Sequence, residues 1–157
     1  MNKLDTALTR MAGKRVYIDT NIFIFFTQKN QDYFAVVAPF IQACFNHTIF
    51  ATTGLLAIAE VMVYPYRTND PVLIAQFKTF FSKKDFLTIV GHENECYDTA
   101  ALLAGKQGMK LLDAIHYVTA LQNNCQFIIT NDRGFQSSET VEVIQLEDLL
   151  ETPLASQ

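Results

Sequence analysis

Short apolar runs alternate along the chain with longer segments in which apolar residues recur at helical spacing. The short runs show no clean alternation of polar and apolar positions, which is typical of strands buried on both faces. They predict five strands, at residues 15–18, 49–52, 86–90, 127–130 and 141–146. The periodic segments predict helices, over residues 20–27, 33–45, 54–63, 71–82, 93–105 and 111–123, with a short helical tail after the last strand. This order predicts an α/β protein with a parallel sheet.

Several helix ends are marked by capping or breaking residues. Thr53 is a suitable N-cap for the third helix, and Pro65 predicts that this helix stops before it. Pro71 suits the first turn of the next helix. Gly105 and Gly108 supply the stop signals of the helix that precedes residue 111.

Four acidic residues stand where the predicted elements meet. Asp19 and Asp132 follow the first and fourth predicted strands directly, whereas Glu60 and Asp113 lie on predicted helices. In open parallel sheets, ligands bind at the carboxyl ends of the strands, near the point where the strand order reverses. The four acids are therefore candidates for one shared acidic pocket.

Three of these acids also have ordinary explanations when taken singly. Asp19 suits the N-cap of the helix that follows it, and Asp113 suits the start of a helix, where a carboxylate is favoured. Asp132 lies next to Asn131 and two residues before Gly134, so a turn role also fits.

Glu60 has no such explanation within its own helix. Its neighbours three and four positions away are apolar, namely Leu56, Ala57, Val63 and Tyr64. A buried, unpaired carboxylate costs several kcal/mol, so a partner is expected: an Arg or Lys from elsewhere, a proton or a metal ion. Residues 54–66 contain no Lys or Arg.

Gathered acids would repel one another, and a divalent cation would relieve that repulsion. Mg²⁺ and Mn²⁺ prefer carboxylate oxygens and water, whereas zinc is disfavoured because no Cys or His falls at ligand spacing. Asn21 is either a turn residue or a further polar group of the same site. His116, three residues after Asp113, is either a base or ligand or, as the spacing favours, a packed or partly exposed residue.

Composition narrows the class of protein. The chain has 157 residues, which predicts one domain over residues 1–157, and its 50% hydrophobic and 18% charged content excludes disorder. The formal net charge of −4 lacks the basic character of most nucleic-acid binders, so any such contact must come from local Lys and Arg or from a metal. The 13 Phe indicate either a partner surface or a Phe-rich core.

The chain shows no feature of a secreted or membrane protein. Its three cysteines are far apart in sequence, which disfavours disulfides and a structural zinc site and fits a reducing compartment. Residues 1–15 lack the apolar core of a signal peptide, and no apolar stretch is long enough to cross a membrane. We therefore expect a cytoplasmic protein.

Four segments together resemble the PIN-domain family, most closely its small VapC-type toxins. They read YIDTNIFI, TTGLLAIAEVMVYP, LLDAIHYVTAL and FIITNDRGF, in the order and at the separations usual in that family. The resemblance covers nearly the whole chain and implies a three-layer α/β/α sandwich with a five-stranded parallel sheet. It also implies an acidic quartet for Mg²⁺ or Mn²⁺, formed by Asp19, Glu60, Asp113 and Asp132. The supporting polar positions would be Asn21, Thr130 and Asn131.

The resemblance and the acids together predict a metal-dependent endoribonuclease that cleaves RNA with a metal-activated water, as the toxin of a type II toxin–antitoxin pair. One alternative is a PIN protein that binds RNA with a metal but without turnover. Another is a phosphatase or receiver-like protein that uses Asp19, although further acids close to Asp19 in sequence are lacking. A homodimer and a cognate antitoxin are the expected protein partners.

Overall fold

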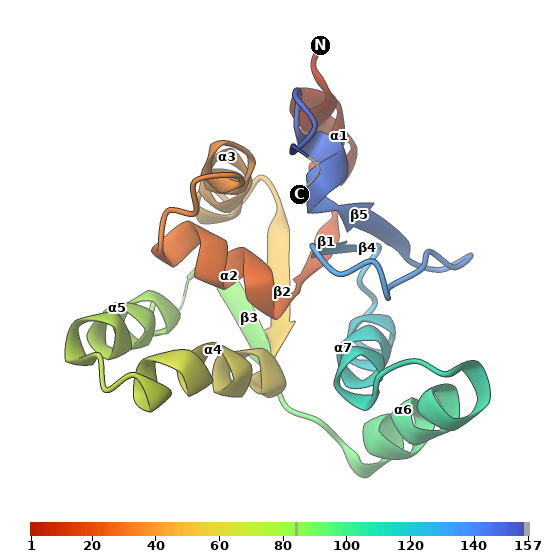
Figure 1. Cartoon of the computed structure of the whole chain (residues 1–157). Helices are drawn as coiled ribbons and strands as arrows, with labels where there is room; N and C mark the ends of the chain where they lie inside the picture. Colours follow the sequence, from red (N-terminus) through yellow and green to blue (C-terminus); the bar gives the residue numbers. More distant parts are fainter. Residues whose placement is uncertain (84, 156–157) are drawn as a thin grey trace.

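A five-stranded parallel sheet forms the centre of the protein in the computed structural model, which describes residues 1–83 and 85–155 (Figure 1). The strands are β1 (Arg15–Ile18), β2 (Phe50–Gly54), β3 (Leu87–Val90), β4 (Phe127–Thr130) and β5 (Glu142–Gln145). The helices are α1 (Lys3–Met11), α2 (Thr20–Thr27), α3 (Phe34–Phe45), α4 (Leu55–Arg67), α5 (Pro71–Phe81), α6 (Asn94–Gln107), α7 (Leu111–Gln122) and the 3₁₀ turn η1 (Leu146–Leu149).

The strand order is β3-β2-β1-β4-β5, and every neighbouring pair is parallel. The order reverses between β1 and β4, where Ile18 pairs with Ile129. The residues that follow these two strands therefore meet at the switch point of the sheet, where ligands bind in folds of this class.

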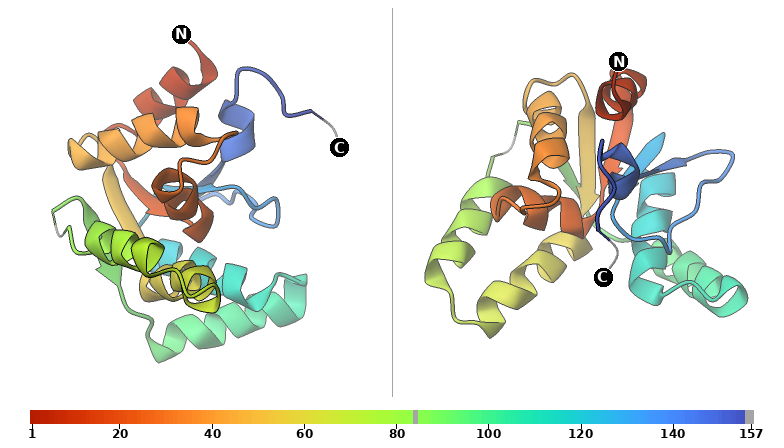
Figure 2. Two further views of the ribbon diagram at one scale, coloured as in Figure 1. Left: turned by 60° about the vertical axis from the view of Figure 1, so that its left-hand side comes forward. Right: turned by 45° about the horizontal axis from the view of Figure 1, so that its top comes forward.

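Helices cover both faces of the sheet (Figures 1 and 2). Helices α1, α2, α3 and α5 lie on one side, and the α6–α7 pair lies on the other, with α7 in contact with β2. Successive residues of β1 show why: Val16 and Ile18 belong to the large core on the first side, whereas Tyr17 packs in the smaller core on the side of α7. The predicted three-layer α/β/α arrangement is confirmed.

Helix α4 differs from the prediction at both ends. It continues through Pro65 to Arg67, and the burial of the proline ring offsets the backbone hydrogen bond that proline cannot make. Its N-cap is Gly54 and not Thr53, which lies in β2 and donates its hydroxyl to the carbonyl of Ile18 at 2.8 Å.

Helix α1 was not predicted, although its apolar residues follow helical spacing. Ala7 and Met11 are buried, and Leu4 and Leu8 pack against the same core. Asn2 caps the helix by accepting a hydrogen bond from the amide of Asp5. The charged residues between these positions concealed the pattern.

Most phenylalanine side chains lie in the core. Phe23, Phe26, Phe45, Phe80 and Phe86 contact one another in edge-on pairs on the side of α2, α3 and α5, and Phe26 also stacks on Phe34. The Phe-rich core therefore accounts for most of this composition.

The three cysteines are buried and free. Across the described residues, no helix is both long and apolar enough to cross a membrane.

Candidate active site

The pairing of β1 with β4 places Asp19 beside Thr130. Asp19 is the N-cap of α2, and its Oδ1 accepts the amide hydrogen of Thr20 at 2.8 Å. Its Oδ2 accepts the hydroxyl hydrogen of Thr130 at 2.6 Å. The predicted capping role of Asp19 is confirmed, and the same carboxylate stands at the switch point of the sheet.

Asp19 is only 5% exposed, and this burial dominates its electrostatics. Burial raises the pKa of Asp19 above its ordinary value, while His116, Thr130 and the Thr20 amide partly oppose the rise. The nearby charge of Glu60 raises the pKa further. A positive charge next to Asp19 would therefore stabilise its ionised form.

Asp132 and Asp113 meet above Gly134. Asp132 Oδ1 accepts the amide hydrogen of Gly134 at 2.7 Å, which confirms a turn role. A Cβ atom at Gly134 would lie 3.0 Å from Asp132 Oδ1 and 3.5 Å from Asp113 Oδ2. Because glycine has no side chain, both carboxylates can lie close to residue 134 and therefore close to each other.

The electrostatics of Asp113 reflect this crowding. Burial, the charge and hydrogen bond of Asp132, and the charge of Asp19 raise the pKa of Asp113 to about 6 from an ordinary 3.8. Asp113 therefore carries unrelieved repulsion from two other acids of the predicted quartet.

Glu60 has a partner that the sequence analysis did not assign. His116 Nε2 contacts Glu60 Oε1, and the hydroxyl of Thr20 donates to the same oxygen at 2.9 Å. The side chain of Glu60 is 29% exposed, so it is less buried than expected. The partner of Glu60 within the described chain is thus a histidine and a threonine, not an Arg or Lys.

These contacts set the acidity of Glu60. Burial pushes the pKa of Glu60 upward, but the hydrogen bond and charge of His116 and the bond from Thr20 outweigh it, so the pKa lies below its ordinary value. The contacts of His116 and Thr20 thus favour the ionised form of Glu60, and the charge of Glu60 in turn acts on Asp19.

His116 itself is packed, as the spacing favoured, and is 1% exposed. Its Nε2 lies 3.8 Å from Asp19 Oδ1, so it stands between two candidate site acids. Tyr17 contacts His116 Nδ1 at 2.7 Å. Sequence reasoning missed Tyr17 because the contact joins residues 99 positions apart and leaves no local signal.

The supporting polar residues are not equally close to the acids. Thr130 bonds Asp19 directly and also accepts the amide hydrogen of Asp132 at 3.0 Å. Asn131 lies beside Tyr33, where it opposes the rise that burial causes in the pKa of that tyrosine. Asn21 makes no side-chain hydrogen bond to the acids within the described residues.

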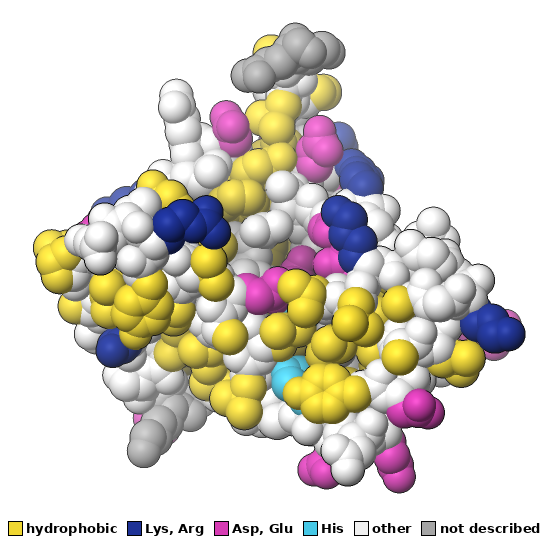
Figure 3. Space-filling model, turned by 60° about the horizontal axis from the view of Figure 1, so that its bottom comes forward, with side chains coloured by type: hydrophobic (Ala, Val, Ile, Leu, Met, Phe, Trp, Pro, Cys, Tyr) yellow, Lys and Arg dark blue, Asp and Glu magenta, His cyan; other side chains and the backbone are white. Residues whose placement is uncertain are grey.

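A cleft opens beside Asp113 and Asp132. Its volume is about 660 Å³, and it runs along the α6–α7 turn and the loop after Gly134. Its polar lining includes Gln107, Lys110, Gln136, Ser137 and Ser138. The face viewed in Figure 3 shows acidic side chains gathered in a central hollow, with Lys or Arg side chains close by.

The donor chemistry of the site fits a hard divalent cation. All four acids offer oxygen, and Mg²⁺ commonly keeps water molecules between itself and some of its carboxylates. Within residues 1–83 and 85–155, no three His, Cys, Asp or Glu side chains are arranged to hold a metal ion. A cation would therefore draw the acids closer or bind partly through water.

Comparison with known proteins decides the family. The PIN domain family matches residues 16–139, which span β1 to the loop before β5. The chain belongs to the PIN-domain family. No curated protein matches the sequence.

Several solved structures share this fold at low identity. The VapBC2 complex from Rickettsia felis bound to a promoter DNA fragment matches with a TM-score of 0.63 and 15% identity, over 83% of this chain and 98% of that one. A toxin–antitoxin complex from Klebsiella pneumoniae gives 0.59 and 20%, over 80% and 94%. VapC20 from Mycobacterium tuberculosis, a sarcin-ricin loop cleaving toxin, gives 0.60 and 8%, over 72% and 86%.

Proposed function

We propose that this PIN-domain protein is a metal-dependent endoribonuclease and the toxin of a type II toxin–antitoxin pair. The observation that carries the proposal is that Asp19, Glu60, Asp113 and Asp132, from four separate elements, lie near one another around the switch point of the sheet. The sarcin-ricin loop cleaving activity of one structural neighbour supports RNA as the substrate class.

Asp19, Glu60, Asp113 and Asp132 are the residues that would hold Mg²⁺ or Mn²⁺, some of them through water. The cation, when bound, supplies activation of water and neutralisation of the negative charge that develops on the phosphodiester. Thr130 orients the Asp19 carboxylate, and Gly134 leaves room for Asp113 and Asp132 to approach each other. No side chain needs to act as a nucleophile.

The cleft beside Asp113 and Asp132 is the place for the RNA strand. Lys110 is exposed and lines it, so its ammonium group can contact a phosphate. The hydroxyl and amide groups of Ser137, Ser138 and Gln136 can contact sugar and base edges. The net charge of −4 makes this local cation important, because the rest of the surface supplies little attraction for RNA.

The activity is tested by RNA cleavage with Mg²⁺ or Mn²⁺, using wild type, Asp19→Asn and Asp98→Asn. We expect Asp19→Asn to lose at least about 100-fold in rate, because a candidate ligand loses its charge, whereas outer-shell changes cost about 10–100-fold. Asp98 is an exposed acid on α6, so its variant controls for the loss of one negative charge. Equal cleavage by wild type and Asp19→Asn would refute the proposal.

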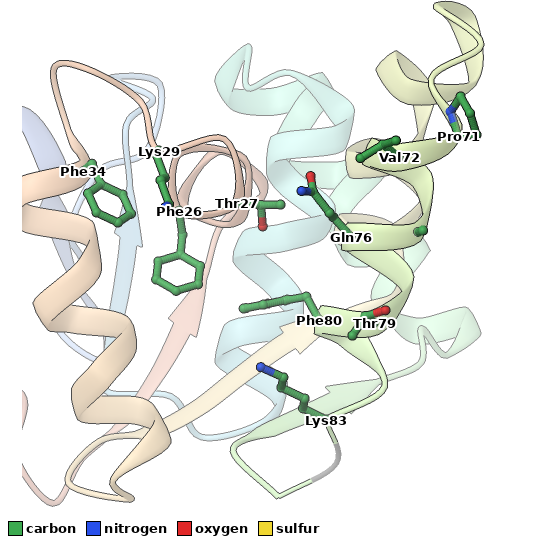
Figure 4. A pocket seen from close by; sticks show the side chains of 11 residues that line it. Phe26, Thr27, Lys29, Phe34, Pro71, Val72, Gln76, Thr79, Phe80 and Lys83 are labelled. Carbon is green, nitrogen blue, oxygen red and sulfur yellow. The ribbon is translucent and has the colours of Figure 1, made fainter.

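An apolar groove between α2, the start of α3 and α5 suits the expected antitoxin (Figure 4). Its volume is about 690 Å³; Phe26, Phe34 and Phe80 line it, as do Lys29 and Lys83. An amphipathic segment with acidic residues would match both the rings and the lysines. Co-expression with the adjacent reading frame tests this: we expect a complex that Phe34→Asp weakens, and an unchanged complex would contradict this place of docking.

An RNA-binding module without turnover is the second candidate. It is motivated by the low basic content of the chain. Calorimetric titration with Mn²⁺, followed by RNA binding, separates the two functions. Binding of both without cleavage under any divalent metal would favour the module over the nuclease.

A further inference from the structure

A buried chain of hydrogen bonds runs from the start of α4 to Glu60. The amide of Gly54 donates to the hydroxyl of Tyr17 at 3.2 Å, and that hydroxyl contacts His116 Nδ1 at 2.7 Å. His116 Nε2 then contacts Glu60 Oε1. Tyr17 is 0% exposed and His116 is 1% exposed, so water has no access to the links between them.

Which atom donates in each bond is constrained by the groups at the two ends of the chain, since an amide N–H only donates and a carboxylate only accepts. The Gly54 amide can only donate, so the Tyr17 oxygen accepts there and is free to donate its own hydrogen to His116 Nδ1. An imidazole that accepts at Nδ1 carries its proton on Nε2. That proton faces Glu60 Oε1, which as a carboxylate can only accept, so the hydrogen from Tyr17 and the carboxylate of Glu60 favour the same form of His116.

Both donors to Glu60 within the described chain end on the same oxygen. His116 and the hydroxyl of Thr20 meet at Oε1, and neither uses Oε2. Two donors at one carboxylate oxygen fix the rotation of a side chain that is otherwise partly exposed. The second oxygen is left for another ligand.

We propose that Tyr17 and His116 are positioning residues: Tyr17 fixes the Nε2–H tautomer of His116, which holds Glu60 by Oε1 and leaves Oε2 for the cation. The inference rests on the proposed function for the identity of the ligand, but its chemistry can be measured without RNA. Outer-shell donors of this kind orient metal ligands and affect affinity.

The alternative is a purely structural role, in which Tyr17 and His116 only fill the core. Their rings make an edge-on contact at 5.7 Å between centroids, which Phe at position 17 would preserve. Core filling predicts that removing the hydroxyl changes neither the tautomer nor the metal affinity. The two interpretations therefore differ in what Tyr17→Phe does.

The protein contains an internal reference for the tautomer. The amide of Leu56 donates to His92 Nε2 at 3.1 Å, so His92 carries its proton on Nδ1, which faces Thr119 Oγ1 at 3.0 Å. His92 and His116 should thus show opposite tautomers in one sample. His47 is exposed and provides a solvent-averaged third signal.

The first test is ¹⁵N NMR of the histidine rings in the metal-free full chain at pH 7. We expect Nε2–H for His116 and Nδ1–H for His92 in wild type. In Tyr17→Phe we expect His116 to shift toward a mixture of forms while His92 stays unchanged. Protons on both nitrogens of His116 in wild type, or an unchanged His116 signal in Tyr17→Phe, would overturn the proposal.

The second test is Mn²⁺ affinity by calorimetry for wild type, Tyr17→Phe, His116→Gln and His116→Asn. A Gln amide reaches the place of Nε2 and can donate to Glu60, whereas an Asn amide reaches only the place of Nδ1. We expect His116→Gln to retain most of the affinity and His116→Asn to lose about tenfold or more, in the range of outer-shell changes. Equal affinities for the Gln and Asn variants would contradict the positioning role.

Thermal melting first establishes that each variant is folded, and Tyr17→Phe carries the test if His116→Asn does not fold. The outcomes separate this inference from the proposed function. Tautomer and affinity changes without RNA cleavage by wild type leave the positioning role standing and refute the nuclease. Metal-dependent cleavage with an unaffected tautomer refutes the positioning role alone.

Discussion

Asp113 is a weaker acid in the folded protein than in a free chain, because its pKa is raised from 3.8 to about 6. Asp132 and Asp19 contribute to this rise together with burial. The repulsion disappears when a proton or a cation is present. Asp113 therefore links the stability of the metal-free protein to pH.

The sign of that link can be worked out from the two pKa values. Between pH 3.8 and about 6 the folded carboxyl keeps a proton that the unfolded chain has released, so the folded state binds more protons. Stability then falls as pH rises through this window. In thermal melts with EDTA from pH 4 to 8 we expect this fall in wild type and a shallower one in Asp113→Asn.

The same melts with Mg²⁺ provide the control. A bound cation removes the repulsion, so we expect the wild-type melting temperature to recover at pH 7 and that of Asp113→Asn to recover less. A wild type that melts at the same temperature from pH 4 to 8 without metal would contradict the crowding of acids around Asp113.

Gly134 is the second residue that decides the geometry of the acids. The Cβ of Gly134→Ala would lie 3.0 Å from Asp132 Oδ1, which is tight enough to displace that carboxylate. We expect Mn²⁺ affinity to fall by about tenfold, the lower end of the losses seen for outer-shell changes. Calorimetry measures it.

Gly105→Ala is the matched control for Gly134→Ala. Gly105 lies inside α6, and a Cβ there meets no atom within 4 Å. Alanine should therefore stabilise the protein by about 0.5–1 kcal/mol, as it does inside helices, with Mn²⁺ affinity unchanged. Similar affinity losses in both variants would refute the special role of Gly134.

At the scale of elements, local signals predicted the boundaries of β1, β4 and α2 as the structure has them. Each begins or ends at a change from apolar to polar residues that needs no distant partner. The errors at α4 have distant causes: Leu56 donates to His92 in place of a cap from Thr53, and burial keeps the helix intact at Pro65. The sequence alone does not reveal such partners.

The candidate site likewise combines residues that local signals locate with contacts that depend on distant partners. Asp19, Asp113 and Asp132 stand at or near the ends of elements, where the sequence can locate them, whereas Glu60 lies inside α4. The partner of Glu60 comes from α7, and Tyr17 comes from β1, so their contacts depend on how α7 packs on the sheet. Packing of this kind is set by the whole fold and has no local pattern.

The connection between α6 and α7 carries a prediction about RNA. Lys110 lines the cleft beside Asp113, so Lys110→Gln should remove one phosphate contact. We expect weaker binding of single-stranded RNA, with the slope of log affinity against log salt reduced by about 0.7. Fluorescence anisotropy across a salt series measures both quantities.

Lys14 is the matched control, because it is exposed and directly precedes β1, at the amino ends of the strands and thus away from the acids at their carboxyl ends. Lys14→Gln has the same charge change and should bind RNA as wild type does. Equal losses in the two variants would show that general charge, and not the cleft, governs affinity.

For the whole molecule, the exposed hydrophobic side chains favour self-association. They gather on α4, α6 and α7, and include Leu55, Leu102, Leu111 and Leu112, each about half exposed. The face in Figure 3 shows such side chains spread around the acidic hollow. Two copies joined there would bury them together.

Analytical ultracentrifugation tests the predicted homodimer. We expect a dimer at micromolar concentration in wild type and a shift toward monomer in Leu102→Glu, because an unpaired charge would be buried at the interface. Val72→Glu, at a somewhat more exposed site on α5, should remain dimeric. A wild type that sediments only as a monomer would contradict the prediction.

The pairing of β1 with β4 has a consequence for the synthesis of the protein. Asp19 and its partner Thr130 are 111 residues apart, and Asp132 follows still later in the chain. A partly translated chain can hold Asp19 and Glu60 but lacks the strand that completes the site. The proposed nuclease thus cannot act on RNA near the ribosome until β4 and Asp132 have been synthesised.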